Sequence, residues 1–261
     1  MGSDPLHTPL QDPPSGVLGA AQFLTRVPIR LRSEPDLARS VPWFPVVGAL
    51  IGAAVGGVAV GMMEVVPATV AAALAVVAGM LLTGAFHEDG LADTADAMGG
   101  WSPEQRREIL KDSRHGSYGV AAMCSTILIR ILCVASMNPA AAFAGLVAAH
   151  TLGRGAAVGV MGRAAPVPAE GLGADYAKML TPTRAAVGAM ASLGLGAIAL
   201  GWWVVPAAGA VIVGATLVTL IARRAFGGVS GDVLGAVEQV GENVTLVVVS
   251  GLAARHGVWW S

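Results

Sequence analysis

The feature that most constrains this chain is a series of apolar stretches, each about as long as a membrane-spanning helix. The first runs from Trp43 to Met63 and contains no charged residue. About 20 such residues cross the hydrocarbon core of a bilayer as a helix. Similar stretches follow at Ala68–Phe86, Val120–Met137, Ala140–Met161, Ala185–Val205 and Ala207–Ala222. The shorter Val244–Ala254 is either a seventh span, completed by residues 258–260, or a half-buried segment.

Composition supports this interpretation. Of 261 residues, 54% are hydrophobic and 13% are charged, whereas a soluble domain usually carries about 25% charged residues. A surface with so little charge suits contact with lipid. We therefore predict an all-α fold, a polytopic membrane helix bundle with about six to seven transmembrane helices. The formal net charge of −1 gives no indication of a nucleic-acid partner.

The N-terminal region differs from the rest. Residues 1–16 are rich in Pro and polar side chains and lack the order of a signal peptide. We predict a disordered leader there, and a single integral membrane catalytic domain over residues 17–261. The stretch Val17–Val27 is mostly apolar and carries Gln22 and Arg26, which favours an amphipathic helix on the membrane surface.

Within the first span, glycines recur at every fourth position. Gly48, Gly52 and Gly56 form a ridge of small residues on one helix face, which favours close packing of a second helix. A membrane helix that is simply rich in Gly and Ala fits this pattern equally well.

The connections between spans alternate in charge. The turns at 64–67, 138–139 and 206 contain no Lys or Arg. The remaining connections hold Arg26, Arg30, Arg32 and Arg39, then Arg106, Arg107, Lys111 and Arg114, then Arg163, Lys178 and Arg184, and finally Arg223 and Arg224. Basic residues mark the cytoplasmic side. We predict a multi-pass protein of the cytoplasmic (inner) membrane with active-site loops facing the cytoplasm, and leave the C-terminal topology open.

Three aspartates follow the second span directly. Asp89, Asp93 and Asp96 stand at i, i+4 and i+7 and so share one face of a helix. Carboxylates placed together repel unless a cation neutralises them, and no Lys or Arg occurs between residues 87 and 105. Such oxygen ligands suit Mg²⁺ held with waters and substrate phosphates. We predict the three as metal ligands and catalytic residues, against the alternative of a solvated acidic helix start.

A basic block precedes the third span. Its sequence, KDSRHGSYG from Lys111 to Gly119, combines cations, hydroxyls and glycines that together suit phosphate oxygens. We predict that Lys111 and Arg114 are catalytic and neutralise charge on a transferring phosphoryl group. Asp112 is predicted to take part in substrate binding. The alternative is a set of basic anchors at a helix end.

A third polar block leaves the sixth span on the same face. Gly231 would let the backbone approach a ligand closely. Asp232 and Glu242 are predicted to complete a second metal site, since two metals bridging a pyrophosphate promote in-line displacement at phosphorus. A flexible loop with solvated acids fits the pattern as well. Arg154 lies within the fourth span, where an ionisable residue usually faces a cavity, and is predicted to line the substrate pocket.

Five segments, in order, resemble the cobalamin synthase family, the adenosylcobinamide-GDP ribazoletransferases. They cover much of the chain from residue 17 on and read FLTRVP at Phe23–Pro28, WFPVVG at Trp43–Gly48, the block His87–Gly100, KDSRHG at Lys111–Gly116, and GGVSGDVLGA at Gly227–Ala236. Two positions depart from the family pattern: Glu88 replaces an apolar residue, and Ser230 replaces the usual Thr. Neither departure removes a predicted ligand.

The resemblance implies an activity. The adenosylcobinamide-phosphate moiety of adenosylcobinamide-GDP would be transferred to α-ribazole or α-ribazole 5′-phosphate, with release of GMP and formation of adenosylcobalamin or its 5′-phosphate. It implies Mg²⁺ as cofactor and these two compounds as partners, beside membrane lipid. The oligomeric state, a homo-oligomer included, stays open.

Two other functions are compatible with parts of the pattern. A CDP-alcohol phosphotransferase also has spaced aspartates at a helix end, but Asp89-Gly90 is followed by Leu-Ala-Asp and lacks that family's Asp-x2-Asp-Gly-x2-Ala-Arg form. A divalent-cation transporter would hold its ligands near the bilayer midplane on broken helices, whereas these carboxylates are predicted to lie outside the spans.

Overall fold

The computed structural model describes residues 15–31, 36–112, 114–163, 165 and 180–261. These residues form helices joined by turns and loops and contain no β-sheet, which confirms the all-α prediction. Most of the predicted leader, residues 1–14, lies outside the described part, as do Arg32 and Lys178.

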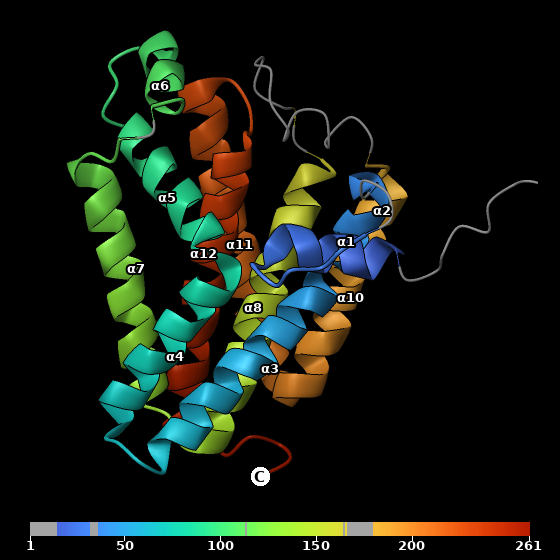
Figure 1. Ribbon diagram of the computed structural model, residues 1–261, viewed down its shortest axis with the longest axis vertical. Helices are drawn as coiled ribbons and strands as arrows, with labels where there is room; N and C mark the ends of the chain where they lie inside the picture. Colours follow the sequence, from blue (N-terminus) through green and yellow to red (C-terminus); the bar gives the residue numbers. More distant parts are fainter. Residues whose placement is uncertain (1–14, 32–35, 113, 164, 166–179) are drawn as a thin grey trace, which may run out of the picture.

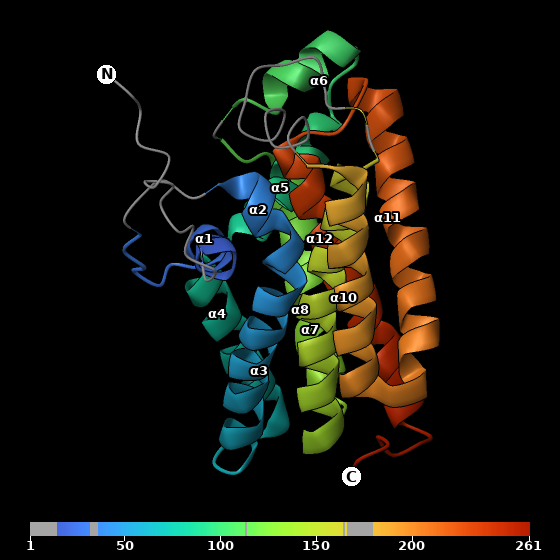
Figure 2. The ribbon, with the colours of Figure 1, turned by 90° about the vertical axis from the view of Figure 1, so that its right-hand side faces the viewer.

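The long helices follow the predicted spans with one correction: the turn expected at Pro206 lies at Gly201–Trp203, and Pro206 is inside the helix that follows. They are α3 (Phe44–Met63), α4 (Ala68–Thr83), α7 (Ser117–Ala135), α8 (Pro139–Met161), α10 (Pro182–Leu200), α11 (Val204–Phe226) and α12 (Gly231–Ala253). Five helical stretches are long and apolar enough to cross a membrane, or six when α4 is joined to the helix after it. One of the five, Pro182–Phe226, has 45 residues, about twice the length that one crossing needs. It turns at the short 3-10 helix η2 (Gly201–Trp203), so that α10 and α11 run in opposite directions (Figure 2).

Polar caps and backbone geometry explain where several helices begin and end. The side chain of Asn138 accepts a hydrogen bond from the backbone N–H of Ala141 at the start of α8, with Pro139 at the first helical position. Ser230 caps α12 in the same way through the N–H of Val233. Gly227 ends α11 with a φ of 84°, a left-handed conformation that glycine adopts without steric cost.

A sharp bend follows α4. Gly84 and Ala85 have φ values of 71° and 56°, and the chain turns by 91° before α5 (Phe86–Ala97) begins. A left-handed conformation costs about 1–2 kcal/mol for a residue with a Cβ, so the surrounding packing must hold Ala85 in place. The bend directs the polar helix α5 toward the end of the bundle where the short helix α6 (Pro103–Ile109) lies (Figure 1).

The N-terminal helices lie beside the bundle. α1 (Ser15–Leu24) crosses α3 in Figure 1, and α2 (Leu37–Ser40) leads through the 3-10 helix η1 (Val41–Trp43) into α3. In α1, Ala20 and Leu24 are buried while Leu18 and Gln22 are exposed. A helix is therefore present within the predicted Val17–Val27 stretch and buries one face, but it begins at Ser15 and ends at Leu24.

The connections sort to two ends of the bundle. The turns after α3, α7 and α10 lie at one end, and α5, α6 and the ends of α8 and α11 lie at the other (Figures 1 and 2). We call the second the polar end. It holds Arg106, Arg107, Arg114, Arg163, Arg184, Arg223 and Arg224. The predicted alternation of basic and uncharged connections is thus reproduced.

The sequence predicts a connection between the sixth span, which ends at Ala222, and the apolar stretch that begins at Val244, and this prediction was wrong beyond Ser230. α12 begins at Gly231 and runs for 23 residues without a break. Trp259 and Trp260 follow the end of α12 and donate hydrogen bonds to the carbonyls of Ile198 and Ala199 at the C-terminal end of α10. The C-terminal end of α12 therefore lies opposite the polar end of the bundle (Figures 1 and 2). The polar residues of α12 concealed the helix because they face other helices rather than water.

The glycine ridge of α3 packs against α8. A Cβ at Gly52 would lie 2.6 Å from the carbonyl oxygen of Leu146, and one at Gly56 would lie 2.9 Å from the ring of Phe143. Gly48 approaches the carbonyl of His150 just as closely. A Cβ at Gly57, on the outer face, would meet nothing within 4 Å. Of the two alternatives, the ridge for close helix packing is confirmed.

This contrast predicts opposite effects of one substitution. Gly52→Ala should lower the free energy of unfolding by about 1–3 kcal/mol, because the new methyl group forces the backbones of α3 and α8 apart. Gly57→Ala should leave stability unchanged or raise it by up to about 1 kcal/mol, because alanine favours the helix. Thermal unfolding of both variants in the same detergent measures the difference. Equal effects would contradict the packing described here.

Candidate active site

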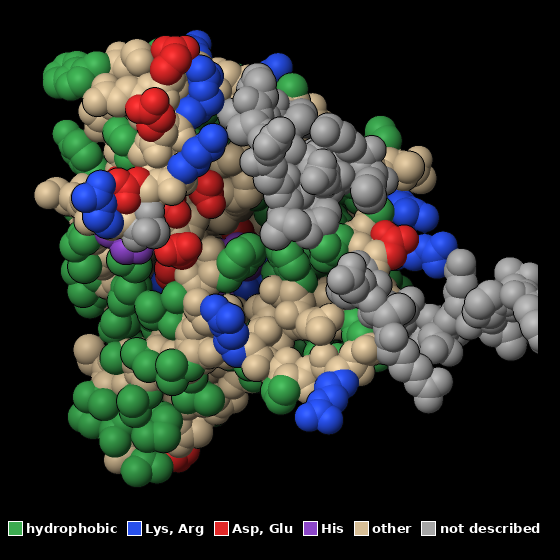
Figure 3. Space-filling view, turned by 45° about the horizontal axis from the view of Figure 1, so that its top comes forward, with side chains coloured by type: hydrophobic (Ala, Val, Ile, Leu, Met, Phe, Trp, Pro, Cys, Tyr) green, Lys and Arg blue, Asp and Glu red, His purple; other side chains and the backbone are tan. Residues whose placement is uncertain are grey.

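Two of the three predicted aspartates lie together at the polar end. Asp89 and Asp93 project from successive turns of α5. His115, in the loop before α7, places its Nε2 3.5 Å from Asp89 Oδ1 and its Nδ1 3.5 Å from Asp93 Oδ1. One ligand atom from each of the three residues lies within 4.8 Å of the others. Acidic, basic and histidine side chains gather in this region of the surface (Figure 3). We call these three residues the acidic group.

Asp96 does not join the acidic group. Its Oδ2 accepts a hydrogen bond of 2.6 Å from the N–H of Gly116, and its Oδ1 accepts one of 2.8 Å from the N–H of Gly119. The side chain is buried against the start of α7, where a carboxylate satisfies N–H groups that lack a partner within the helix. The structure thus assigns Asp96 to fixing α7 on α5, contrary to its predicted place among the metal ligands.

The basic block lies beside the acidic group because His115 belongs to the same loop. Lys111 is exposed, and the side chain of Arg114 is 86% exposed. Arg114 Nη2 lies 2.6 Å from Asp112 Oδ2, and its hydrogen bonds lower the pKa of Asp112 to about 2. Asp112 therefore carries a charge at neutral pH and orients Arg114. In this structure Asp112 is the ion-pair partner of Arg114, and the side chains of Lys111 and Arg114 are both accessible to a substrate.

The start of α12 completes this surface. Asp232 lies close enough to Asp93 and Asp89 for their charges to interact. Glycines allow this approach, because a Cβ at Gly90 would lie 2.9 Å from the carbonyl oxygen of Asp232 and 3.3 Å from the Cα of Gly235. A Cβ at Gly231 would meet nothing within 4 Å, so the first turn of α12 is open on that side. The structure therefore brings Asp232 and Gly231 to the acidic group.

Glu242 was predicted beside Asp232, and the structure places it elsewhere. Ten residues along an α-helix cover about 15 Å, so Glu242 lies deep in the bundle, where it is buried. Arg154 Nη1 lies 3.0 Å from Glu242 Oε1, Arg130 Nη1 lies 3.4 Å from Oε2, and His150 pairs with the same carboxylate. Glu242 is therefore separated from Asp232 and pairs with two guanidinium groups, while His150, Glu238 and Glu242 place ligand atoms within 4.8 Å of one another.

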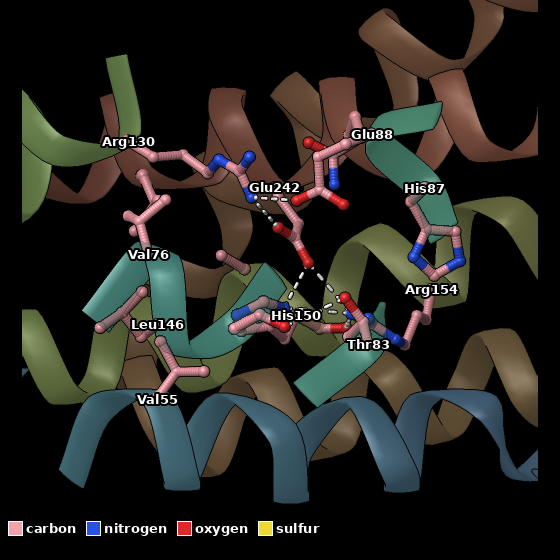
Figure 4. A pocket seen from close by; sticks show the side chains of 14 residues that line it. Val55, Val76, Thr83, His87, Glu88, Arg130, Leu146, His150, Arg154 and Glu242 are labelled. Atoms are coloured by element: carbon pink, nitrogen blue, oxygen red, sulfur yellow. Dashed lines mark hydrogen bonds and ion pairs between the residues drawn. The ribbon is translucent and has the colours of Figure 1, made fainter. Parts of the chain in front are cut away.

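Glu242 is the centre of a larger buried ion network (Figure 4). Glu88 of α5 pairs with Arg130 of α7 at 3.0 Å. Glu238 of α12 lies 2.6 Å from Arg154 Nη1, and its other oxygen lies 3.5 Å from His87 Nδ1. We call the seven residues His87, Glu88, Arg130, His150, Arg154, Glu238 and Glu242 the buried network. The small cavity among them has about 10 Å³, enough for about one water molecule.

The buried network changes two interpretations. Arg154 does face a cavity, as its place in a span predicted, but the cavity is far too small for a nucleotide or a corrinoid. In this structure Arg154 pairs with Glu238 and Glu242 of the buried network. Glu88, which departs from the family pattern, is an ion-pair partner of Arg130 and does not belong to the acidic group.

Sequence reasoning missed some of these residues. His115 was predicted only as part of a phosphate-binding block. Asp93 and Asp89 lie 22 and 26 positions earlier, and no local sequence pattern indicates that His115 contacts them. Glu238 and Glu242, like His150 and Arg154, are spaced at i, i+4 on apolar stretches. Two such pairs, one of them inside a predicted span, are a signal of a shared buried network.

The geometry of Asp96 yields a prediction about stability. Asp96→Asn should lower the thermal unfolding midpoint, because the amide group cannot accept both backbone hydrogen bonds and a buried N–H loses its partner. The expected loss is about 1–3 kcal/mol. Asp89→Asn should leave the midpoint nearly unchanged, since Asp89 is exposed. If Asp89→Asn destabilises the protein as much as Asp96→Asn, the distinction between the two aspartates fails.

The buried network yields a second prediction. Glu242→Gln should destabilise the fold by about 3–5 kcal/mol, because it leaves buried arginine charge without its central anion. Glu64→Gln, in the exposed turn after α3, should change stability by less than about 0.5 kcal/mol. Denaturant or thermal unfolding in a single detergent compares the two. A stable Glu242→Gln protein would show that the network does not hold the bundle together.

Comparison with known proteins identifies the relatives of this chain. The family model described as cobalamin-5-phosphate synthase matches residues 16–250. Similar curated proteins include the adenosylcobinamide-GDP ribazoletransferases of Ralstonia nicotianae, 39% identical over 88% of this chain and 92% of the relative, and of Ralstonia pickettii, 35% identical over 90% and 93%. That of Azorhizobium caulinodans is 36% identical over 92% and 97%.

No solved structure matches the chain. The matched residues of this chain include the acidic group, the basic block and the buried network. They also include all of the spans except the last three residues of α12. Because that match extends over nearly the whole chain, the protein belongs to the cobalamin-5-phosphate synthase family.

Proposed function

We propose that this protein transfers the adenosylcobinamide-phosphate moiety of adenosylcobinamide-GDP to α-ribazole or α-ribazole 5′-phosphate and releases GMP. The observation that carries the proposal is the family match, together with curated relatives that bear the ribazoletransferase name over about nine-tenths of the chain. The acidic group supports it, since carboxylates and cations meet at the polar end of a membrane bundle. The family match favours this activity over a CDP-alcohol phosphotransferase or a cation transporter.

The reaction breaks one bond and forms one bond at phosphorus. A ribose hydroxyl oxygen of the α-ribazole attacks the phosphorus next to cobinamide, and a new P–O bond forms. The bond from that phosphorus to the bridging pyrophosphate oxygen breaks, and the bridging oxygen leaves with GMP. The hydroxyl proton must be released, and negative charge builds up on the leaving phosphate. The protein therefore has to hold a pyrophosphate and stabilise additional negative charge.

The acidic group fits a magnesium ion. Asp89 and Asp93 offer exposed or half-buried carboxylate oxygens within 4.8 Å of each other, and Asp232 adds charge from α12. Carboxylates with open positions for phosphate and water are the usual ligands of Mg²⁺. Bound there, the ion would supply positive charge against the pyrophosphate. His115 lies within the same group, so we place it with Asp89, Asp93 and Asp232 at the proposed metal site.

The remaining residues at the polar end have roles that need no metal. Lys111 and Arg114 are accessible cations, which suits them to bind the phosphates and to stabilise the leaving GMP. Asp112 orients Arg114 through a charge-assisted hydrogen bond. Gly231 leaves the first turn of α12 open to a ligand. Asp96 fixes the start of α7 and thereby the loop that carries these cations.

We further propose that the protein lies in the cytoplasmic membrane with its polar end facing the cytoplasm. The support is the distribution of arginine, which is concentrated at that end, while the turns after α3, α7 and α10 contain neither Lys nor Arg. Basic residues are retained on the cytoplasmic side during insertion. This orientation would present the acidic group to soluble, phosphorylated substrates.

The proposed reaction predicts the effect of removing the acidic group. Asp89→Asn and Asp93→Asn should each lower turnover on the order of 100-fold with saturating Mg²⁺, because each removes a charged ligand of the metal site. The assay incubates purified protein in lipid with adenosylcobinamide-GDP, α-ribazole and Mg²⁺ and detects the cobamide product and GMP by mass spectrometry. A chelator should abolish the activity, and added Mg²⁺ should restore it.

Glu104→Gln is the matched control, since Glu104 is an exposed acid of α6 whose partner is Arg107. It should retain normal turnover. Near-normal turnover of both aspartate variants would refute the metal site while leaving the transferase activity standing. Failure of the unchanged protein to form GMP would refute the activity itself, and release of CMP from a CDP-alcohol or metal flux in proteoliposomes would support one of the alternatives.

A further inference from the structure

A large groove lies on the side of the bundle away from the acidic group. Its volume is about 480 Å³, and it runs between α8, α10 and α11, the three helices that face the viewer on the right of Figure 2. α8 forms its floor with small residues such as Gly155 and Gly159. All three helices belong to membrane-spanning stretches, so the groove opens toward lipid. Its volume falls in the range of ligand-binding pockets, about 300–1,000 Å³.

The interior of the groove is apolar. The hydroxyls along it belong to Ser192, Thr216 and Thr219, and each donates to a carbonyl of its own helix at 2.7 Å. These groups therefore have their hydrogen bonds satisfied and present carbon to the groove. A nucleotide or sugar would bury polar atoms there without partners, which is unfavourable. The interior suits a hydrocarbon chain.

The groove is lined by two cationic side chains, and both lie where the groove meets the polar end of the bundle. Arg163 follows α8, and Arg223 lies one turn before the end of α11. Arg163 donates one hydrogen bond, to the carbonyl of Gly159, out of the five N–H groups of a guanidinium. Neither arginine forms an ion pair with a carboxylate within the part of the chain that the structure describes. Among the described residues, neither charge therefore has a carboxylate partner at the point where the apolar groove reaches the polar end of the bundle.

The length of the groove agrees with one lipid leaflet. Along α11 its lining extends from Ala208 to Arg223, and 15 helical steps cover about 22 Å. A bilayer is about 40–45 Å thick with its headgroup regions, so one leaflet is about 20–22 Å. A lipid whose headgroup meets Arg163 and Arg223 would lie with its acyl chain along the groove, directed toward the interior of the bilayer.

We propose that the groove between α8, α10 and α11 binds one anionic glycerophospholipid from the leaflet at the polar end. The phosphate and the anionic headgroup pair with Arg163 and Arg223, and an acyl chain lies along α11 over the small residues of α8. Basic pockets between membrane helices bind anionic headgroups through this combination of charge and hydrocarbon contact. The site is separate from the acidic group, and its occupancy does not depend on the proposed transferase activity.

The test compares two lipids with identical acyl chains, phosphatidylglycerol and phosphatidylcholine. Native mass spectrometry of the detergent-purified full chain counts bound lipids as each lipid is titrated. We expect one retained lipid per chain and a preference of roughly 10- to 30-fold for phosphatidylglycerol, the value expected for two arginines near the surface. Arg163→Gln/Arg223→Gln should abolish the preference. Arg224→Gln, which removes a neighbouring exposed charge outside the groove, should retain it.

A second variant tests the hydrocarbon part of the site. Gly159→Leu places a side chain in the groove, where the new Cβ would meet only Arg163 Nη1, at 3.7 Å. It should reduce retention of both lipids about tenfold or more while the arginines remain. Equal retention of the two lipids by the unchanged protein would overturn the proposal. So would a preference that survives loss of both arginines, undiminished binding to Gly159→Leu, or a dimer that Gly159→Leu dissociates.

Discussion

The buried network is the constraint on which the rest of the bundle depends. Three carboxylates and two guanidinium groups lie inside a stack of apolar helices, where an isolated charge would cost several kcal/mol. They are tolerated because each meets an opposite charge, and those partners come from different helices. Glu88 binds α5 to α7 through Arg130, and Glu242 binds α12 to α8 through Arg154. The helices must therefore keep one relative position for the charges to stay paired.

The position of α5 connects this network to the candidate active site. Its first turn places His87 and Glu88 in the network, and its next turns place Asp89 and Asp93 at the surface. The left-handed residues Gly84 and Ala85 give the chain the bend that α5 requires. Gly90 then allows α12 to approach within backbone contact distance, which brings Asp232 beside the acidic group. Charge pairing, backbone geometry and helix packing thus fix the same helix.

The spans, their polarity and the glycine ridge could be predicted from the sequence because each has a local signal. Length and hydropathy predict a crossing, and spacing predicts which residues share a face. Asp89 and Asp93 were placed together by that rule. The same rule placed Asp96 with them, but its partners, the N–H groups of Gly116 and Gly119, are supplied by a distant segment. The first half of α12 was mistaken for a connection because a helix with inward-facing polar residues has the composition of a solvated loop.

Because Glu88 and Asp89 are adjacent in the sequence, their separate partners fix the rotation of α5 about its helix axis. Successive helical residues point about 100° apart, so one rotational setting alone directs Glu88 to Arg130 and Asp89 to His115. Turning α5 by one residue position would separate the first pair and carry an aspartate into the apolar interior. The buried network therefore fixes the rotation of α5 about its axis and, with it, the direction in which the surface carboxylates point.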